Sequence, residues 1–205
     1  MRTARLVRAL WLGCAVCLLS SCDDGGSDPV KLSPGYLPLE VGNYWDFIGV
    51  NSATDDVVLH REVKAIVKLN GHEYYLTISS VPSGKSIADS AYYRVDDQKN
   101  VYLYRKSMEN EELKYKLDAK EGDTWTYPFF NDDYMDVVLY IGPIETSSKT
   151  VNNCKNYYFD AKGWVDEEYT SSLAPGVGFI KEYSDAWGVG MVLSKASIGG
   201  NVIEF

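Results

Sequence analysis

Apolar and polar residues alternate with a period of two along most of the chain from Trp45 onward. Successive side chains of a β-strand point to opposite faces of a sheet, so this alternation predicts short strands that are buried on one face. No segment of helical length carries an apolar stripe with the 3.6-residue period of a helix. The pattern therefore predicts an all-β protein of antiparallel strands.

The clearest pair of strands is predicted at residues 57–69 and 72–80. In the first strand the apolar side chains share one face, which Arg61 interrupts. Between the strands stands Asn70-Gly71, a dipeptide that accepts the positive φ angles of a two-residue type I′ turn. We therefore expect a β-hairpin here.

The register of this hairpin separates the two histidines of the chain. In the simplest pairing around the turn, His72 lies opposite Leu69 and His60 lies opposite Val81. The two imidazoles are then far apart along the strands. A metal site built on both histidines is not predicted, and both are interpreted as exposed strand residues.

Further strands follow from the same alternation and are separated by clusters of turn residues. They are predicted at residues 91–95, 101–107, 114–117, 134–141, 154–160, 178–183 and 191–198. About nine strands predict a single antiparallel domain whose curved sheet forms a half-barrel, a barrel or a sandwich.

Two segments of the chain resemble each other. Residues 37–45 and 117–125 share leucine, glycine and tryptophan at matching positions, and Asn43 corresponds to Asp123. Each segment predicts a tight turn at glycine that delivers a large aromatic side chain into the core at the start of a strand. The similarity indicates a repeated half-sheet, with chance resemblance as the alternative.

The N-terminus follows a different pattern. A basic start precedes an apolar run at residues 9–19, which is shorter than the roughly 20 apolar residues that span a bilayer. Such a sequence is typical of a secretion signal. The run ends in Leu19-Ser20-Ser21-Cys22, which resembles the lipobox of bacterial lipoproteins. An ordinary signal peptide with an incidental cysteine is the alternative.

The lipobox resemblance implies three regions. Residues 1–21 are the signal peptide, and Cys22 becomes the lipidated first residue of the mature protein. Residues 22–35 are rich in Gly, Pro and Ser and predict a flexible tether to a β domain at 36–205. We expect a lipoprotein of the cell envelope, anchored in the membrane through Cys22 and located at the periplasmic face or at the cell surface.

Net charge restricts the partners. The 205 residues carry 20 Lys and Arg against 29 Asp and Glu, a net charge of −9 that removal of the three signal arginines makes more negative. Such a surface argues against nucleic acid and against electrostatic docking on anionic lipid. Cys154 remains alone after lipidation of Cys22, so no disulfide within the domain is predicted and Cys154 is interpreted as a half-buried packing residue.

Familiar catalytic motifs do not occur in the sequence. It lacks the G-x-S-x-G, H-E-x-x-H and S-x-x-K patterns of hydrolases. Asn131-Asp132-Asp133 with Asp136 is the best local group of oxygen ligands, but it does not match a calcium loop, and its acids are interpreted as solvated turn residues. We predict no catalytic residue, no metal and no cofactor.

Tyrosine is the unusual component, with 16 residues. Five of them fall on the more polar faces of their predicted strands: Tyr75, Tyr102, Tyr104, Tyr134 and Tyr140. Exposed tyrosines on a flat sheet stack against sugars or pack against a partner protein, and we take these five as a candidate binding surface. The high β-propensity of tyrosine is the alternative explanation.

Several turn motifs resemble a broad set of bacterial secreted lipoproteins that have no assigned activity. Their opening P-L-x-V-G-N-x-W pattern is similar to residues 38–45, their G-D-x-W pattern to residues 122–125, and their late P-G-V-G-x-[IV]-K pattern to residues 175–181. The resemblance spans most of the mature chain. It implies an antiparallel curved sheet and no particular chemistry.

These observations predict a non-catalytic binding or interaction module whose partner is an envelope protein, a glycan or an apolar ligand. The alternative is an envelope glycan hydrolase that uses a pair of carboxylates. The hydrolase predicts a cleft with two converging acids and a raised pKa, whereas the binding module predicts an aromatic platform or a dry apolar pocket.

Overall fold

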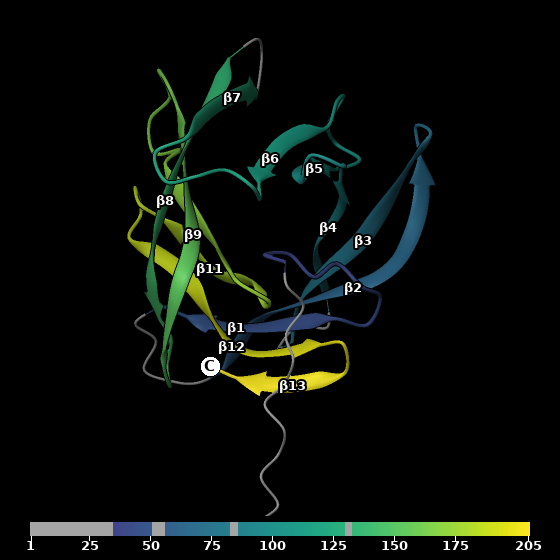
Figure 1. Ribbon diagram of the computed structural model, residues 1–205, viewed down its shortest axis with the longest axis vertical. Helices are drawn as coiled ribbons and strands as arrows, with labels where there is room; N and C mark the ends of the chain where they lie inside the picture. The colour runs from purple at the N-terminus through teal and green to yellow at the C-terminus, as the bar shows by residue number, and fades with distance from the viewer. Residues whose placement is uncertain (1–34, 51–55, 83–85, 130–132) are drawn as a thin grey trace, which may run out of the picture. The chain divides into compact units, whose positions relative to one another are not determined.

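The computed structural model describes residues 35–50, 56–82, 86–129 and 133–205 (Figure 1). They form one antiparallel sheet of 13 strands, more than the nine or so predicted, and the sheet curves into a nearly closed barrel. The strands are β1 (Tyr44–Gly49), β2 (Val57–Leu69), β3 (His72–Val81), β4 (Ser86–Val95), β5 (Asn100–Tyr104), β6 (Glu112–Lys116), β7 (Thr124–Pro128), β8 (Tyr134–Glu145), β9 (Thr150–Ala161), β10 (Tyr169–Ala174), β11 (Gly178–Ser184), β12 (Val189–Ile198) and β13 (Asn201–Glu204). The all-β prediction is confirmed.

The sheet consists of two meanders. Strands β1 to β6 pair in sequence order, strands β7 to β12 do the same, and β1 pairs with β12 to join the two halves. Figure 1 shows β1 and β12 between the two groups, while β6 and β7 are the edge strands that face each other across a seam. The short β13 folds back on β12.

The predicted internal repeat has a structural counterpart. In the first copy, the amide N–H of Gly42 donates to the carbonyl oxygen of Val63 at 2.9 Å. The amide N–H of Val63 in turn donates to the carbonyl oxygen of Asn43 at 2.9 Å. Gly42 has a φ of +94°, a conformation that suits glycine. The turn brings Trp45 into the core with no exposed surface.

The second copy repeats this geometry at the start of β7. The amide of Gly122 donates to the carbonyl oxygen of Leu139 at 2.8 Å, and the amide of Leu139 donates to that of Asp123 at 3.1 Å. Gly122 has a φ of +85°, and Trp125 is buried. The two matched segments therefore open the two meanders in the same way.

The hairpin of β2 and β3 confirms the strongest sequence prediction, with one correction. Leu69 lies opposite His72 as expected, but His60 lies opposite Ser80 and not Val81. A β-bulge between Val63 and Ala65 adds one residue to β2 and causes this shift of one position.

The bulge also divides the apolar face that the sequence indicated along residues 57–69. Val63 is fully buried and pairs with the buried Thr77, whereas Val67 beyond the bulge pairs with Tyr74. Side chains alternate along a strand, so the extra residue moves the second half of the apolar series to the other face of the sheet.

One end of the barrel is closed by the segment that precedes β1. Leu37 and Leu39 of this segment belong to the core. The indole N–H of Trp45 donates to the carbonyl oxygen of Val177 at 2.7 Å, and the amide of Gly176 donates to that of Gly35 at 2.7 Å. The chain therefore enters the barrel beside the turn between β10 and β11.

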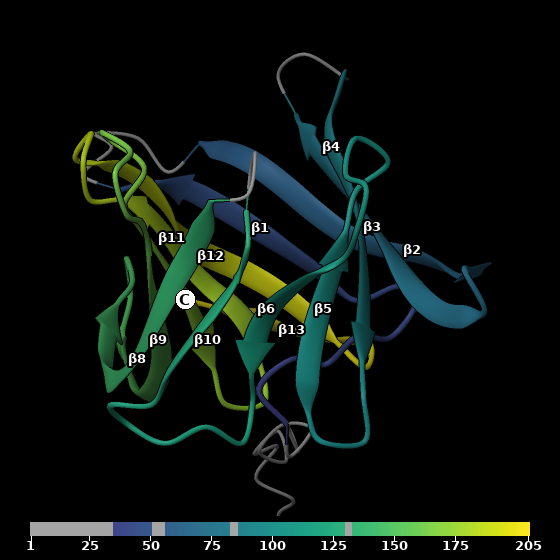
Figure 2. The same ribbon diagram turned by 90° about the horizontal axis from the view of Figure 1, so that it is seen from above.

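The opposite end carries the loops that follow odd-numbered strands, because every neighbouring pair in this sheet is antiparallel. The loops after β9 and β11 lie side by side there (Figure 2), and the amide of Asp185 donates to the carbonyl oxygen of Glu168 at 3.1 Å. None of the segments in the described ranges forms a helix long and apolar enough to cross a membrane.

Candidate functional site

A cavity of about 340 Å³ lies inside the barrel and has a charged wall. Strands from both meanders line it with three cations, two carboxylates and four tyrosines. They are Arg61, Arg105, Lys114, Glu112, Glu182, Tyr93, Tyr115, Tyr127 and Tyr169, with Leu103, Phe129 and Ser171 between them. This polar cavity differs from the aromatic platform and from the dry apolar pocket that the sequence analysis expected of a binding module. Its two carboxylates, one with a raised pKa, are features expected of the hydrolase alternative.

The cavity lies toward the end of the barrel opposite the closed one. Arg105 directly follows β5, Glu112 begins β6, Phe129 directly follows β7 and Tyr169 begins β10. All four positions are at the ends where odd-numbered strands stop and even-numbered strands start. The cavity therefore occupies the end that carries the long loops.

Arg61 and Glu182 form the deepest charged pair. Arg61 Nη1 donates to Glu182 Oε1 at 2.7 Å, and Arg61 Nε donates to Ser79 Oγ at 3.2 Å. The guanidinium carbon lies 4.6 Å from the centre of the Phe179 ring. Arg61 is 9% exposed, whereas the Glu182 side chain keeps 33% exposure, so the carboxylate faces the cavity.

This pairing sets the protonation of Glu182. Burial by itself raises the pKa of the carboxyl group, but the charge and the hydrogen bond of Arg61 outweigh burial and hold the pKa below its ordinary value. Glu182 is therefore ionised at neutral pH.

Lys114 and Glu112 have no such partner. Both side chains line the cavity, and so does that of the next residue, Tyr115. The register between β5 and β6 shifts at Lys114, so the alternation of side chains is interrupted there. Within the residues that the structure describes, neither forms an ion pair. Burial raises the pKa of Glu112, against the opposing charges of Lys114 and Arg105.

The Lys114 ammonium lies among aromatic rings. Its Nζ donates to the hydroxyl oxygen of Tyr169 and lies 4.4 Å from the centre of the Phe159 ring. The rings of Phe159 and Tyr169 stack with centres 4.5 Å apart. Burial lowers the pKa of Lys114 to about 8, although the charge of Glu112 opposes this shift.

Side chains close the seam beside this strand. The indole N–H of Trp125 on β7 donates to the carbonyl oxygen of Leu113 at 3.2 Å, and the hydroxyl of Tyr157 donates to that of Lys116 at 3.2 Å. The outer edge of β6 is thus held by side-chain donors and not by a neighbouring strand. The strand that carries Glu112 and Lys114 forms part of this seam.

The cavity offers several kinds of contact to a ligand. It provides charged donors, charged acceptors, tyrosine and serine hydroxyls and aromatic faces. Burying Lys114 and Glu112 against an apolar ligand would be costly, because these two charged groups form no ion pair among the described residues and would lose water without gaining a partner. The arrangement suits a polar ligand with its own hydrogen-bonding groups.

The five tyrosines singled out in the sequence do not form one surface. Tyr102 and Tyr104 lie on the outer side of β5, where the Arg94 guanidinium lies 3.9 Å from the Tyr102 ring and the rings of Tyr104 and Tyr92 are 6.0 Å apart. Tyr75 differs from expectation: it pairs with Tyr93 and packs against the core.

The remaining two tyrosines lie on β8. Tyr134 is 59% and Tyr140 is 52% exposed, and they alternate with the buried Met135, Val137 and Leu139. They belong to the other meander from Tyr102 and Tyr104. The structure therefore divides the candidate surface between two separate outer faces, and binding at these tyrosines stays a prediction.

The acidic residues near β8 are engaged by neighbours. Asp133 accepts a hydrogen bond from the indole of Trp164 at 2.7 Å, and Asp136 pairs with Lys162 at 2.6 Å. Asn131 and Asp132 lie outside the described residues. Among the described side chains, no group of three or more His, Cys, Asp and Glu could hold a metal ion.

The two histidines and Cys154 differ in how deeply the structure buries them. His60 is half-buried, with its Nδ1 2.6 Å from Asp46 Oδ1, while His72 is exposed at the hairpin turn. Cys154 is fully buried, deeper than predicted, and its thiol donates to the carbonyl oxygen of Val151 at 3.2 Å. Cys22 lies outside the described residues.

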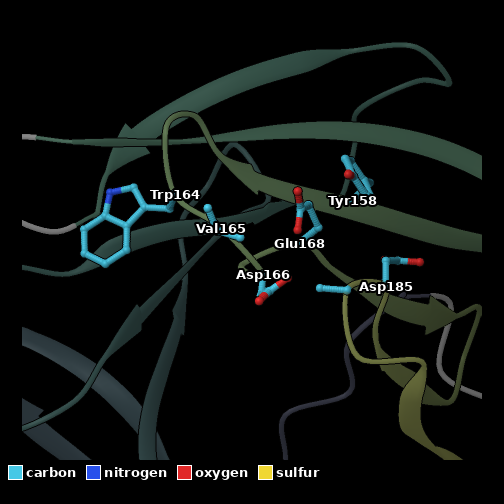
Figure 3. A pocket seen from close by; sticks show the side chains of 7 residues that line it. Tyr158, Trp164, Val165, Asp166, Glu168 and Asp185 are labelled. Carbon is cyan, nitrogen blue, oxygen red and sulfur yellow. The ribbon is translucent and has the colours of Figure 1, made fainter.

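A second hollow, of about 400 Å³, lies outside the barrel between the loops after β9 and β11 (Figure 3). Asp166, Glu168 and Asp185 contribute carboxylates to it, and no cation lines it. Figure 3 shows the Trp164 indole pointing away from these acids. The inner cavity, with fixed charges of both signs, is the stronger candidate site.

One residue in the sequence pointed to this site. Arg61 interrupted an otherwise apolar face, and that face points into the barrel. Lys114 begins the predicted strand 114–117, but nothing in its alternation distinguished an inward lysine from an outward one. Glu182 and Tyr169 reach the cavity only through the pairing of distant strands.

No known protein family and no curated protein matches the sequence of this chain. Two solved structures match. One, from Bacteroides fragilis, is provisionally described as an exported protein with a YmcC-like fold, with 12% identity, a TM-score of 0.46, and coverage of 84% of this chain and 100% of that one. The other, from Parabacteroides distasonis, is provisionally described as a lipoprotein, with 14% identity, a TM-score of 0.40, and coverage of 83% and 99%.

Proposed function

We propose that this chain is a non-catalytic binding protein of the cell envelope, anchored through Cys22, and that its inner cavity holds a polar, sugar-like ligand. The single observation that carries the proposal is the cavity wall, where five charged side chains and four tyrosines surround about 340 Å³. Pockets of this size accommodate small ligands.

The mixture of groups favours a sugar over the other partners predicted from the sequence. Carboxylates accept hydrogen bonds from sugar hydroxyls, tyrosine hydroxyls both donate and accept them, and aromatic faces pack against sugar rings. The charged groups argue against an apolar ligand. A concave site also suits a small ligand better than it suits the flat surface of a protein partner.

The experiment that tests this function blocks the cavity. Arg105 lines the mouth and its side chain is 37% exposed, so Arg105→Trp fills space there, while Lys106→Trp places the same indole on the exposed neighbouring position as a control. The probe is an immobilised panel of mono- to tetrasaccharides. We expect the wild type and Lys106→Trp to bind the same sugars and Arg105→Trp to lose them.

Two outcomes contradict the function. If no sugar of the panel binds the wild type, the sugar class is wrong. If Arg105→Trp retains full binding, the cavity is not the site. Circular dichroism on all three proteins verifies that the variants keep the β fold.

The anchor has its own test. The lipobox at residues 19–22 predicts that a fatty-acid analogue fed to producing cells labels the protein and that Cys22→Ala abolishes the label. Labelling of the Cys22→Ala variant contradicts anchoring at this residue. The domain itself should fold equally well in both forms, because Cys22 lies ahead of the barrel.

One observation favours the second candidate, a glycan hydrolase. Glu112 and Glu182 line the same cavity and have pKa values shifted in opposite directions, a pattern that assigns an acid and a base in glycosidases. The ion pair of Glu182 with Arg61 is the reason that we prefer binding. Release of reducing ends from panel oligosaccharides, abolished by Glu112→Gln, would establish the hydrolase.

A further inference from the structure

We infer that the ligand of the inner cavity carries a carboxylate, and that this carboxylate binds the ammonium group of Lys114. The inference rests on the proposed function and names the ligand class as acidic sugars. It begins with the charges that line the cavity.

Lys114 is the cation of the cavity wall that the described structure leaves without a carboxylate partner. Arg61 pairs with Glu182 at 2.7 Å. Arg105 pairs with Asp89 at 3.2 Å, at the more exposed mouth. Lys114 contacts only the neutral hydroxyl of Tyr169 and the faces of aromatic rings.

Such a placement is unfavourable for a charged ammonium group. An ammonium group that leaves water needs a compensating charge, and contacts with aromatic rings compensate only in part. Charged residues that break a packing rule in this way are expected at functional or strained sites.

A ligand with one negative charge fits this wall better than a dianion does. Two of the three cations already have carboxylate partners, Arg61 with Glu182 and Arg105 with Asp89, which leaves Lys114 in the described part of the wall. A phosphate dianion would bring a second negative charge close to Glu112 and Glu182, which repel it. A carboxylate supplies one negative charge for one ammonium group.

Glu112 extends the match to the rest of the ligand. It lies two residues before Lys114, lines the same cavity, and also has no ion pair in the described part of the chain. Its carboxyl group can accept or share hydrogen bonds with hydroxyls that neighbour the ligand's carboxylate. A hexuronic acid presents both groups on one ring.

The experiment is a titration of the mature protein with D-galacturonate and, as the neutral counterpart, D-galactose, followed by NMR chemical shifts. We expect galacturonate to bind the wild type at least tenfold more tightly than galactose. Lys114→Met should reduce galacturonate binding at least tenfold and should reduce galactose binding much less, because galactose has no carboxylate to pair with the ammonium group. Lys106→Met removes the same charge from an exposed position and should have no effect.

A second measurement separates binding from folding. Galacturonate affinity should fall as the pH rises through the pKa of Lys114, whereas galactose affinity should stay constant. In Lys114→Met, galacturonate affinity should not change over the same pH range.

The outcomes distinguish the two proposals. Equal binding of both sugars to the wild type, or unchanged galacturonate binding by Lys114→Met, overturns the carboxylate inference and leaves sugar binding in place. Absence of binding by both sugars, together with an empty saccharide panel, overturns the proposed function and the inference with it.

Discussion

Arg61 on β2 and Glu182 on β11 form an ion pair of 2.7 Å across 121 residues of sequence. The pair joins the first meander to the second inside the barrel. Removal of one partner leaves the other charge desolvated, and a fully buried pair then loses about 3 to 5 kcal/mol. Glu182 still reaches water through the cavity, so we expect Arg61→Met to lower the free energy of unfolding by about 2 kcal/mol.

Urea unfolding measures this change. The control is Lys195→Met, which removes an exposed pair with Glu204 at 3.1 Å, and should change stability by less than about 1 kcal/mol. Equal changes in the free energy of unfolding for the two variants would show that the inner ion pair stabilises the fold no more than a surface ion pair does.

Acid should weaken the barrel partly through Glu182. Arg61 keeps the pKa of Glu182 below its value in the unfolded chain, so the unfolded state binds more protons as the pH falls. The stability that Glu182 contributes is complete above the unfolded pKa and is lost as the pH falls through the folded pKa. Stability measured from pH 6 down to pH 3 should fall less steeply in Glu182→Gln than in the wild type. Parallel curves would contradict this assignment.

The charge of Lys114 should lower the stability of the protein although it serves ligand binding. Its folded pKa of about 8 lies below the unfolded value, so the folded protein releases a proton first as the pH rises, and stability increases above pH 8. We expect Lys114→Met to raise the free energy of unfolding at pH 7 by about 1 kcal/mol while it weakens galacturonate binding. The gain should shrink toward pH 10. A destabilised Lys114→Met would show that the ammonium is a structural element.

Gly190 on β12 lies where no side chain fits. A Cβ atom there would be 2.4 Å from the carbonyl oxygen of Glu182. Gly190→Ala must therefore separate β12 from β11, and we expect a loss of about 3 kcal/mol in thermal or urea unfolding. Gly142→Ala is the matched control, because its Cβ would lie 3.6 Å from Asn156 and needs no movement. Similar losses in both variants would contradict the close approach.

Cys154 should be inert in the folded protein. Burial raises the pKa of its thiol to about 11, and its side chain has no exposed surface. Iodoacetamide at pH 8 should label it only after unfolding by urea, because the thiolate is the reactive form. Rapid labelling under native conditions would mean that β9 opens locally.

Sequence alone predicted the parts of this fold that depend on neighbours along the chain. The hairpin of β2 and β3 followed from alternation and from Asn70-Gly71, and the paired turns at Gly42 and Gly122 followed from their shared residues. The bulge between Val63 and Ala65 could not be predicted, because alternation continues through it. Its effect is visible only in the pairing of the two strands.

The strands outside the predicted ranges have physical reasons of their own. β10 holds four consecutive buried residues, Ser171–Ala174, so it does not alternate. β13 is only four residues long. The cavity could not be predicted for another reason. Lys114, Tyr169 and Glu182 come together only through the curvature of the sheet. In addition, an inward tyrosine such as Tyr115 has the same sequence pattern as an outward one.

The hydrogen bond between Gly176 and Gly35 fixes the point at which the described chain enters the barrel. Gly35 lies at the closed end, and the charged cavity lies toward the opposite end. If Cys22 carries the proposed lipid, the membrane attachment is joined to the end of the barrel that does not bind the ligand. Attachment to the membrane and entry of the ligand would then not compete for the same end of the molecule.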